Sequence, residues 1–174
     1  MNGTDPVTLF GEFASDFAAP TPLVRSRRIG PKAGMTNLWF KLETGHRTGS
    51  YKDRFAAAAI HAMVRSGDHT CVATSSGNTG AALAAYGASA GIHCRIALVE
   101  TAPREKLFQM QASGAELIRV REFGLDEEVT TATFRKLKEL GKRPGHSLQI
   151  SAYCFSPSGM RGVETISTEL ADQL

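Results

Sequence analysis

The chain has 174 residues, of which 42% are hydrophobic and 21% are charged. This length and composition predict a folded domain with a buried core and exclude an intrinsically disordered chain. The formal net charge is +3, but lysine and arginine residues are interspersed with aspartate and glutamate, so we expect no nucleic-acid partner.

The N-terminal segment, up to Pro22, mixes apolar residues with proline and glycine and predicts a packed lead-in with at most short helices. It carries Asp5, Glu12 and Asp16 where a signal peptide would carry basic residues. No apolar stretch in the sequence reaches the roughly 18 residues that are needed to cross a bilayer. We therefore expect a cytoplasmic protein with no membrane partner.

A strand and an amphipathic helix are predicted next, at residues 37–43 and 51–65. Apolar side chains recur on one face of the predicted helix, at Phe55, Ala59, Ile60, Met63 and Val64. Gly67 is expected to end this helix.

From Thr70 onward, short β-branched runs alternate with helical stretches. The predicted strands are residues 70–74, 93–99, 116–120 and 147–151. The predicted helices are residues 78–90, 103–113 and 125–140. Such a repeated βα unit produces a parallel sheet with helices on both faces, so the predicted fold class is α/β.

The C-terminal stretch 163–174 has a helical pattern that continues to the last residue without a capping glycine. We therefore expect the chain to stop within its architecture, with the small α/β domain complete and a larger domain present only in part. The expected division is 1–63 for the first part of the larger domain, 64–156 for the small domain, and 157–174 for the first helix of the returning larger domain.

The three cysteines, Cys71, Cys94 and Cys154, are odd in number and widely spaced, and the first two lie in predicted buried strands. We interpret all three as reduced core residues and not as disulfides or metal ligands. The five histidines show no pair at metal-ligand spacing, so no metal site is expected.

The first candidate site is segment 48–54 (Thr-Gly-Ser-Tyr-Lys-Asp-Arg), where a glycine turn brings Lys52 to the first turn of an apolar helix. An amine must be neutral to attack an aldehyde, and both a helix N-terminus and partial burial favour the neutral form. The alternative is a solvated lysine near an N-capping Ser50. Ser50 and Asp53 are expected to shape the turn, and Arg54 to be a structural or solvated charge.

The second candidate site is segment 74–80 (Thr-Ser-Ser-Gly-Asn-Thr-Gly), between a predicted strand and a predicted helix. Such a loop presents N–H groups, hydroxyls and an amide at the carboxyl edge of a parallel sheet, where carboxylates and phosphates bind. The alternative is an ordinary βα turn with capping hydroxyls. The spacing of a Walker loop or a dinucleotide fingerprint is absent.

Taken together, these segments resemble threonine synthase and its relatives, the fold-type-II pyridoxal-phosphate enzymes. The resemblance rests on segments 21–23 (Thr-Pro-Leu), 38–43 (Leu-Trp-Phe-Lys-Leu-Glu), 49–54 and 76–80, and continues through 81–91, 114–116 and 162–170. It covers nearly all of the chain after Pro20.

The resemblance implies a role for each candidate residue, with pyridoxal 5'-phosphate as cofactor and a small amino acid as substrate. Lys52 would form the Schiff base with the cofactor and later move protons on the substrate. Asn78 would hydrogen-bond the phenolic oxygen of the cofactor. The substrate carboxylate would be bound by Ser75, Ser76, Gly77 and Thr79.

Two departures from the family pattern qualify these roles. Family members are far longer, and their C-terminal half carries the glycine-rich loop for the cofactor phosphate, so weak cofactor binding is expected unless a second chain or a homodimer completes the site. Where threonine synthases often carry Asn-Pro-Tyr and a phosphate-binding arginine, an ungapped register here puts Gly159 at the arginine position. Arg161 could take that role with a small shift.

The function expected from the sequence is a pyridoxal-phosphate-dependent elimination or replacement on an amino acid, with threonine formation from phosphohomoserine as the leading version. A related lyase or synthase, of the threonine dehydratase or cysteate synthase type, is the alternative within enzymes. A non-catalytic fragment that retains the fold is the alternative outside them.

Overall fold

The computed structural model describes residues 20–174 and has an α/β fold built around one parallel sheet. Its strands are β3 (Thr70–Thr74), β4 (His93–Leu98), β5 (Glu116–Arg119) and β6 (His146–Gln149). They lie in the order β5-β4-β3-β6, and every neighbouring pair is parallel. The predicted fold class is confirmed, while residues 1–19, with much of the predicted lead-in, lie outside the described part.

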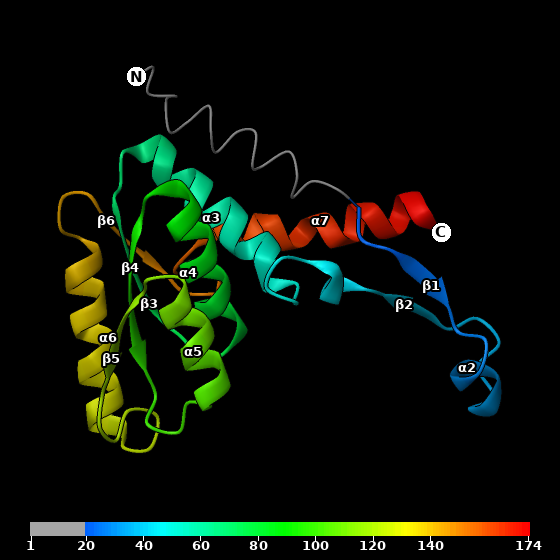
Figure 1. Ribbon diagram of the computed structural model, residues 1–174, viewed down its shortest axis with the longest axis horizontal. Coiled ribbons are helices and arrows are strands. Elements are labelled where there is room, and N and C mark those ends of the chain that lie inside the picture. Colours follow the sequence, from blue (N-terminus) through cyan, green and yellow to red (C-terminus); the bar gives the residue numbers. More distant parts are fainter. Residues whose placement is uncertain (1–19) are drawn as a thin grey trace.

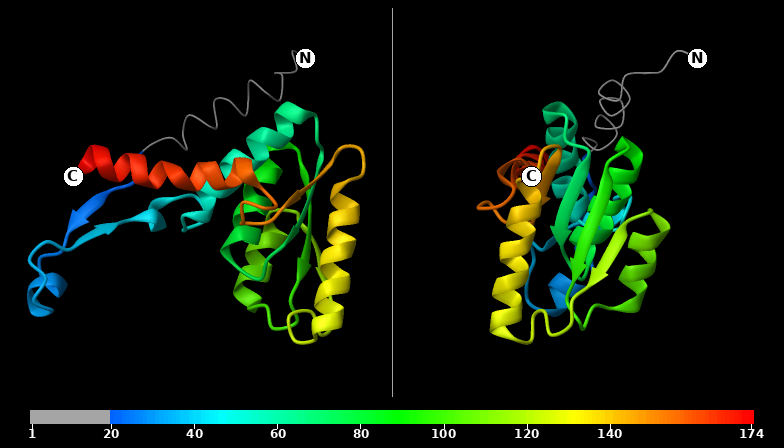
Figure 2. Two further views of the ribbon diagram at one scale, coloured as in Figure 1. Left: turned by 180° about the vertical axis from the view of Figure 1, so that it is seen from behind. Right: turned by 90° about the vertical axis from the view of Figure 1, so that its left-hand side faces the viewer.

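Helices cover both faces of this sheet, as Figures 1 and 2 show. Helices α4 (Asn78–Ala90) and α5 (Arg104–Ala112) lie on one face. Helix α6 (Glu127–Gly141) lies on the other, where Asp126 caps it by accepting a hydrogen bond from the Val129 N–H. The bounds of β3 and α4 are those predicted, and the others differ from prediction by a few residues at their ends.

Strand β3 separates two apolar cores because its side chains alternate between the faces of the sheet. Cys71 and Ala73 belong to the larger core beneath α4. Val72, between them, packs instead into a smaller core with Leu137 of α6. Both faces of β3 are thus covered, which is typical of a strand inside a parallel sheet with helices on both sides.

Helix α3 (Lys52–Ser66) packs along the larger core and ends where predicted, at Gly67 with a left-handed φ of 74°. Helix α7 (Pro157–Gln173) lies against it, as Figure 1 shows. Helix α7 begins earlier than the predicted residue 163, because Pro157 occupies its first turn, where a missing N–H costs no hydrogen bond.

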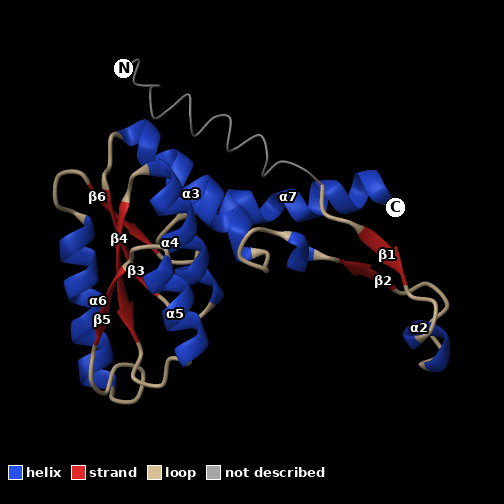
Figure 3. Cartoon of the chain, viewed as in Figure 1, coloured by secondary structure: helices blue, strands red, loops and turns tan. Residues whose placement is uncertain are grey.

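An antiparallel arm, β1 (Leu23–Arg25) paired with β2 (Trp39–Lys41), extends away from the sheet (Figure 3). Between the two strands lies the short helix α2 (Ile29–Lys32), and the 3-10 turn η1 (Glu43–Gly45) follows them. The sequence predicted only the second strand, because a run of three residues and a single helical turn carry too little periodicity to be recognised.

One cysteine prediction is wrong. Cys71 and Cys94 are buried and unpaired, but Cys154 is exposed and therefore is not a core residue. It follows β6 in an irregular segment. Among residues 20–174, no helix is both long enough and apolar enough to cross a membrane.

Gly162 allows the close approach of α7 to α3. A Cβ at this position would lie 2.7 Å from the Cβ of Ala58 and would also meet the carbonyl oxygen of Arg54. We expect Gly162→Ala to lower the free energy of unfolding by about 1 to 3 kcal/mol, because overpacking outweighs the better helix propensity of alanine. Urea unfolding measures this. Gly45→Ala is the control, since an added Cβ there meets nothing within 4 Å; equal effects of the two changes would contradict the prediction.

Candidate active site

The second predicted segment begins at the carboxyl edge of the sheet, and Lys52 of the first reaches the same edge through a hydrogen bond to Ser151. Strand β3 ends at Thr74 and its parallel neighbour β6 ends at Gln149. In parallel strands these ends point to the same edge, so the chain that follows each strand emerges there. Ligands bind at this edge of open α/β sheets. The segments after β3 and after β6 therefore form the walls of the candidate site.

Lys52 is the first residue of α3, and its amine has two described contacts. Its Nζ donates a hydrogen bond of 2.8 Å to Ser151 Oγ and lies 4.4 Å from the centre of the Tyr51 ring. The side chain is half-buried. The N-capping residue is Tyr51 and not Ser50, although Ser50 Oγ accepts a 3.3 Å hydrogen bond from the Lys52 N–H.

Ser75 shapes the loop between β3 and α4. Its Oγ accepts hydrogen bonds from the N–H groups of Gly77, at 3.2 Å, and Gly80, at 2.9 Å. The N–H of Ala81 is bound by the Gly77 carbonyl. Within the described residues, the first-turn N–H groups of Asn78 and Thr79 have no protein acceptor, so they are available to an anion at the positive end of α4.

Two glycines of the loop differ in their surroundings. A Cβ on Gly80 would lie 2.7 Å from the Met110 Cε, so glycine is needed for α4 to pack against α5. A Cβ on Gly77 would meet no protein atom within 4 Å. The open side of Gly77 lies next to the free N–H groups, which is the arrangement expected where a ligand approaches the backbone.

Asp53 fixes the turn before α3, as the sequence indicated. Its carboxylate is buried and accepts hydrogen bonds from the Thr48 N–H, at 2.9 Å, and from the Thr48 hydroxyl, at 2.5 Å. Burial, together with the negative charge of Asp53 and a hydrogen bond to it, raises the pKa of Tyr86 well above its ordinary value. Tyr86 therefore stays neutral, and the turn that carries Lys52 is held from two sides.

Arg54 is a buried structural charge that joins α3 to the arm and to α7. The residue is 5% exposed, and its guanidinium contacts two carboxylates. Nε lies 2.7 Å from Glu43, and Nη1 lies 2.5 Å from Glu169. Lys41 of β2 reaches the same Glu169 at 2.6 Å. The expectation that Arg54 is structural holds; its burial was not predicted, because both carboxylates are distant in sequence.

These contacts change how the carboxyl groups ionise. Hydrogen bonds from Arg54, and then from Lys41 and the Thr21 N–H, outweigh burial and lower the pKa of Glu169 to about 2. Burial opposes the ionisation of Glu43, yet hydrogen bonds from Arg54 and Thr21 leave its pKa below the usual value. Both carboxylates remain charged at neutral pH and hold the guanidinium between them.

Arg161 is not brought into the candidate site by any described contact. It lies exposed on α7. Its charge acts on Tyr153, whose hydroxyl donates a hydrogen bond to Glu164. At the alternative position, Gly159 is buried, and a Cβ there would lie 2.7 Å from a carbon of the Phe55 ring. An arginine would not fit at residue 159 in this packing.

Ser151 is the site residue that the sequence did not predict. It was interpreted as the last residue of a strand, whereas β6 ends at Gln149 and Ser151 lies in the following turn. Its hydroxyl donates weakly to Met160 Sδ, at 3.9 Å, and accepts from Lys52. No local pattern identifies a single serine after a strand, so only the fold could reveal this contact.

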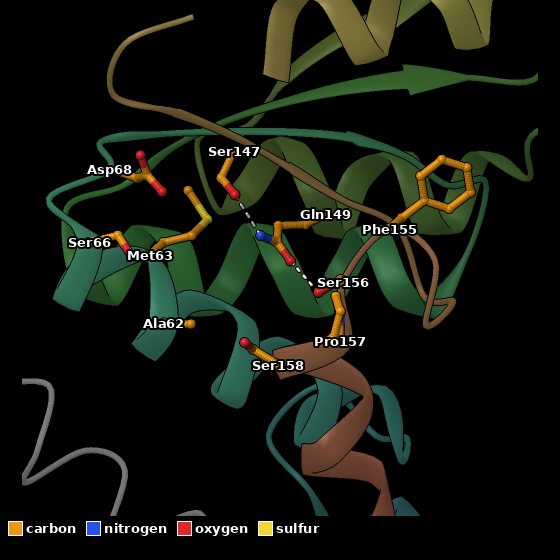
Figure 4. Close-up of a pocket in the computed structure, with 10 residues that line it drawn as sticks. All are labelled: Ala62, Met63, Ser66, Asp68, Ser147, Gln149, Phe155, Ser156, Pro157 and Ser158. Carbon is orange, nitrogen blue, oxygen red and sulfur yellow. Dashed lines mark hydrogen bonds between the residues drawn. The ribbon is translucent and has the colours of Figure 1, made fainter. Parts of the chain in front are cut away.

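A separate cavity of about 210 Å³ lies between α3, β6 and the start of α7 (Figure 4). Within it, Gln149 donates to Ser147 and accepts from Ser156, as the dashed lines show. Neither Lys52 nor the loop after β3 lines this cavity. In residues 20–174 there is no group of three or more histidine, cysteine or acidic side chains that could hold a metal ion.

A half-buried amine and a helix N-terminus with free N–H groups both occur where strands of the parallel sheet end. Such groups can bind an aldehyde and an anionic substrate. Residues 14–174 match the family described as "Pyridoxal-phosphate dependent enzyme". The chain belongs to this family, whose cofactor is pyridoxal 5'-phosphate.

Individual relatives agree with this assignment. The chain is 31% identical over 155 residues to threonine synthase of Methanosarcina acetivorans, and the match covers 88% of this chain and 36% of that enzyme. It is 39% identical over 112 residues to cysteine synthase B of Salmonella typhimurium, and this match covers 61% of this chain and 36% of that enzyme. Maize serine racemase superimposes with a TM-score of 0.76 at 25% identity, over 98% of this chain and 49% of that one. The chain thus spans about a third of the curated relatives' length.

The lowered pKa of Glu169 predicts loss of stability in acid. Because the folded pKa of about 2 lies below the unfolded value of about 4.3, the contribution is complete above about pH 4.3 and is lost as pH falls toward 2. We expect Glu169→Gln to lower the free energy of unfolding by about 2 to 3 kcal/mol near neutral pH and by less in acid.

Urea unfolding at several pH values tests this, with Glu139→Gln as the control. Glu139 pairs with Lys136 on the surface, and its side chain is 57% exposed, so we expect an effect below about 1 kcal/mol. If Glu169→Gln lowered the free energy of unfolding by the same amount at every pH, the lowered pKa of Glu169 would be contradicted.

Proposed function

We propose that this chain carries the lysine of a pyridoxal-phosphate-dependent enzyme that performs elimination or replacement on a small amino acid. The observation that carries the proposal is the hydrogen bond from Lys52 to Ser151, at the sheet edge where the loop of residues 75–79 also begins. A solvated lysine would have no such anchor, so this contact favours the enzymatic interpretation over the surface alternative.

The described residues fit the cofactor. When bound, pyridoxal phosphate supplies an aldehyde for the lysine and a ring that stores the electrons released at the substrate carbon. Lys52 provides the attacking amine and afterwards a base for the proton on that carbon. By resemblance, Asn78 would hydrogen-bond the phenolic oxygen of the ring. Its side chain is exposed at the start of α4, where it is free to do so.

The loop after β3 is proposed to bind the substrate carboxylate. The N–H groups of Asn78 and Thr79 and the hydroxyls of Ser76 and Thr79 supply donors at the positive helix end. Ser75 accepts two hydrogen bonds from its own loop and keeps only its O–H to donate. Gly77 has no side chain, so the carboxylate could come close to the backbone of the loop.

Threonine formation from phosphohomoserine is the leading version of the reaction, and the similarity to threonine synthase over 88% of the chain supports it. A synthase or lyase whose leaving group is not a phosphate is the second candidate. The packing of Gly159 beneath Phe55 favours it, because that packing excludes an arginine at the position of the expected phosphate contact. The non-catalytic alternative is judged by the labelling of Lys52 below.

The remaining parts of the proposal concern assembly. We retain the division into a small domain, residues 64–156, and two pieces of a larger one, residues 1–63 and 157–174. The contact of α3 with α7 and the ion pairs between Arg54 and Glu169 support joining those two pieces. A second copy or a second polypeptide is proposed to complete the cofactor site.

The central test is covalent trapping of the cofactor. We expect reduction with borohydride in the presence of pyridoxal phosphate to give a pyridoxyl adduct on Lys52, located by peptide mass spectrometry. Lys52→Ala should abolish it, whereas Lys142→Ala, which removes an exposed lysine, should leave it unchanged. Equal labelling of Lys52 and surface lysines in the wild-type chain would favour the non-catalytic alternative.

The leaving group is tested through Arg161. If threonine synthesis from phosphohomoserine uses this arginine, we expect Arg161→Ala to raise KM for phosphohomoserine about tenfold or more, the effect of losing one charge-assisted contact. Deamination of threonine should change little. Steady-state assays with product analysis measure both, in a preparation that contains any partner needed for activity. An unchanged KM would support the second candidate.

A further inference from the structure

The amine of Lys52 needs to be held if it is to react selectively. A lysine side chain has four rotatable bonds, and fixing them costs conformational entropy of up to about 2 kcal/mol. The described contacts of the amine are the Ser151 hydroxyl and the Tyr51 ring. Tyr51 is adjacent in sequence and 40% exposed. Ser151 is 99 residues away in sequence and lies two residues after the end of β6, so its contact ties Lys52 to a different part of the fold.

The strand register shows where this support lies. Ala73 of β3 is paired with Gln149 of β6. Ser75 and Ser151 each follow two residues later, so both lie beyond the same edge of the sheet. The serine that binds the lysine therefore lies in the segment that emerges next to the loop of residues 75–79.

The hydroxyl of Ser151 is itself oriented. It donates toward Met160 Sδ of α7 at 3.9 Å, which turns an oxygen lone pair toward Lys52 Nζ. A neutral amine that donates one N–H to this oxygen keeps its own lone pair free. That lone pair can attack an aldehyde carbon, in which case the two amine hydrogens leave with the carbonyl oxygen as water.

We propose that Ser151 is a positioning residue that holds the free amine of Lys52 at the edge of the sheet from which the loop of residues 75–79 also emerges. The inference rests on the proposed function, because it assigns Ser151 a part in forming the bond between Lys52 and an aldehyde. Ser151 acts through Lys52 and through no contact of its own with the substrate.

The test compares Ser151→Ala and Ser151→Thr with the wild-type chain. Ser147→Ala is the matched control, since Ser147 precedes Ser151 by four residues but binds Gln149. Each chain is treated with pyridoxal phosphate and borohydride, and separately with trace formaldehyde and cyanoborohydride. Mass spectrometry gives the labelling of Lys52 relative to exposed Lys142, and thermal unfolding checks that each variant folds.

Ser151→Ala should change the labelling of Lys52 by the two reagents in opposite directions. We expect Ser151→Ala to lower the relative pyridoxyl labelling of Lys52 about three- to tenfold, the size of one lost hydrogen bond. Formaldehyde is small and needs no orientation, so the released amine should react with it faster than in the wild-type chain. Ser151→Thr keeps the hydroxyl and should restore wild-type labelling, and Ser147→Ala should change neither ratio.

The outcomes separate this inference from the proposed function. A wild-type chain in which pyridoxal phosphate shows no preference for Lys52 overturns the proposed function and the role of Ser151 with it. A clear preference that Ser151→Ala leaves unchanged overturns only the role of Ser151. Failure of Ser151→Thr to restore labelling in a folded chain would also overturn it, because the hydroxyl would then not be the holding group.

Discussion

The position of Lys52 depends on the buried charge of Arg54, two residues further along α3. A buried guanidinium is strongly destabilising without carboxylate partners. Arg54 is 5% exposed, and its partners come from η1 and from α7. The first turn of α3 is therefore held in place by parts of the chain that are distant in sequence. Asp53, between the two, adds the hydrogen bonds to Thr48 that fix the preceding turn. The side chain of Lys52 takes no part in these contacts with Glu43, Glu169 and Thr48.

The sheet and its helices could be predicted from sequence because their signals are local. The strand 70–74 has an apolar centre between two β-branched threonines, and the helix 78–90 is rich in alanine and ends at a glycine. The arm could not be predicted in full. Strand β1 and helix α2 are short, and the base of the arm is joined to Glu169, near the other end of the chain, through Thr21 and through Lys41 of β2.

The residues of the candidate site also differ in whether the sequence could predict them. Lys52 and the loop of residues 75–79 lie in motifs with distinctive residue types, so their chemistry could be inferred before the fold was known. Ser151 could not be found, because its importance comes from a strand register and from the end of β6. The obstacle to an arginine at residue 159 was equally hidden, since it arises from the ring of Phe55 on another helix.

The close approach of α3 and α7 also limits which substitutions α7 can accept. Any side chain larger than hydrogen at Gly159 would push against Phe55 and move α7 outward. Met160 would move with the helix, and the hydroxyl of Ser151 is turned toward its sulfur. A substitution at residue 159 would therefore also disturb the contact that holds Lys52. Evolution of a new substrate preference through this helix would require compensating changes at the helix contact first.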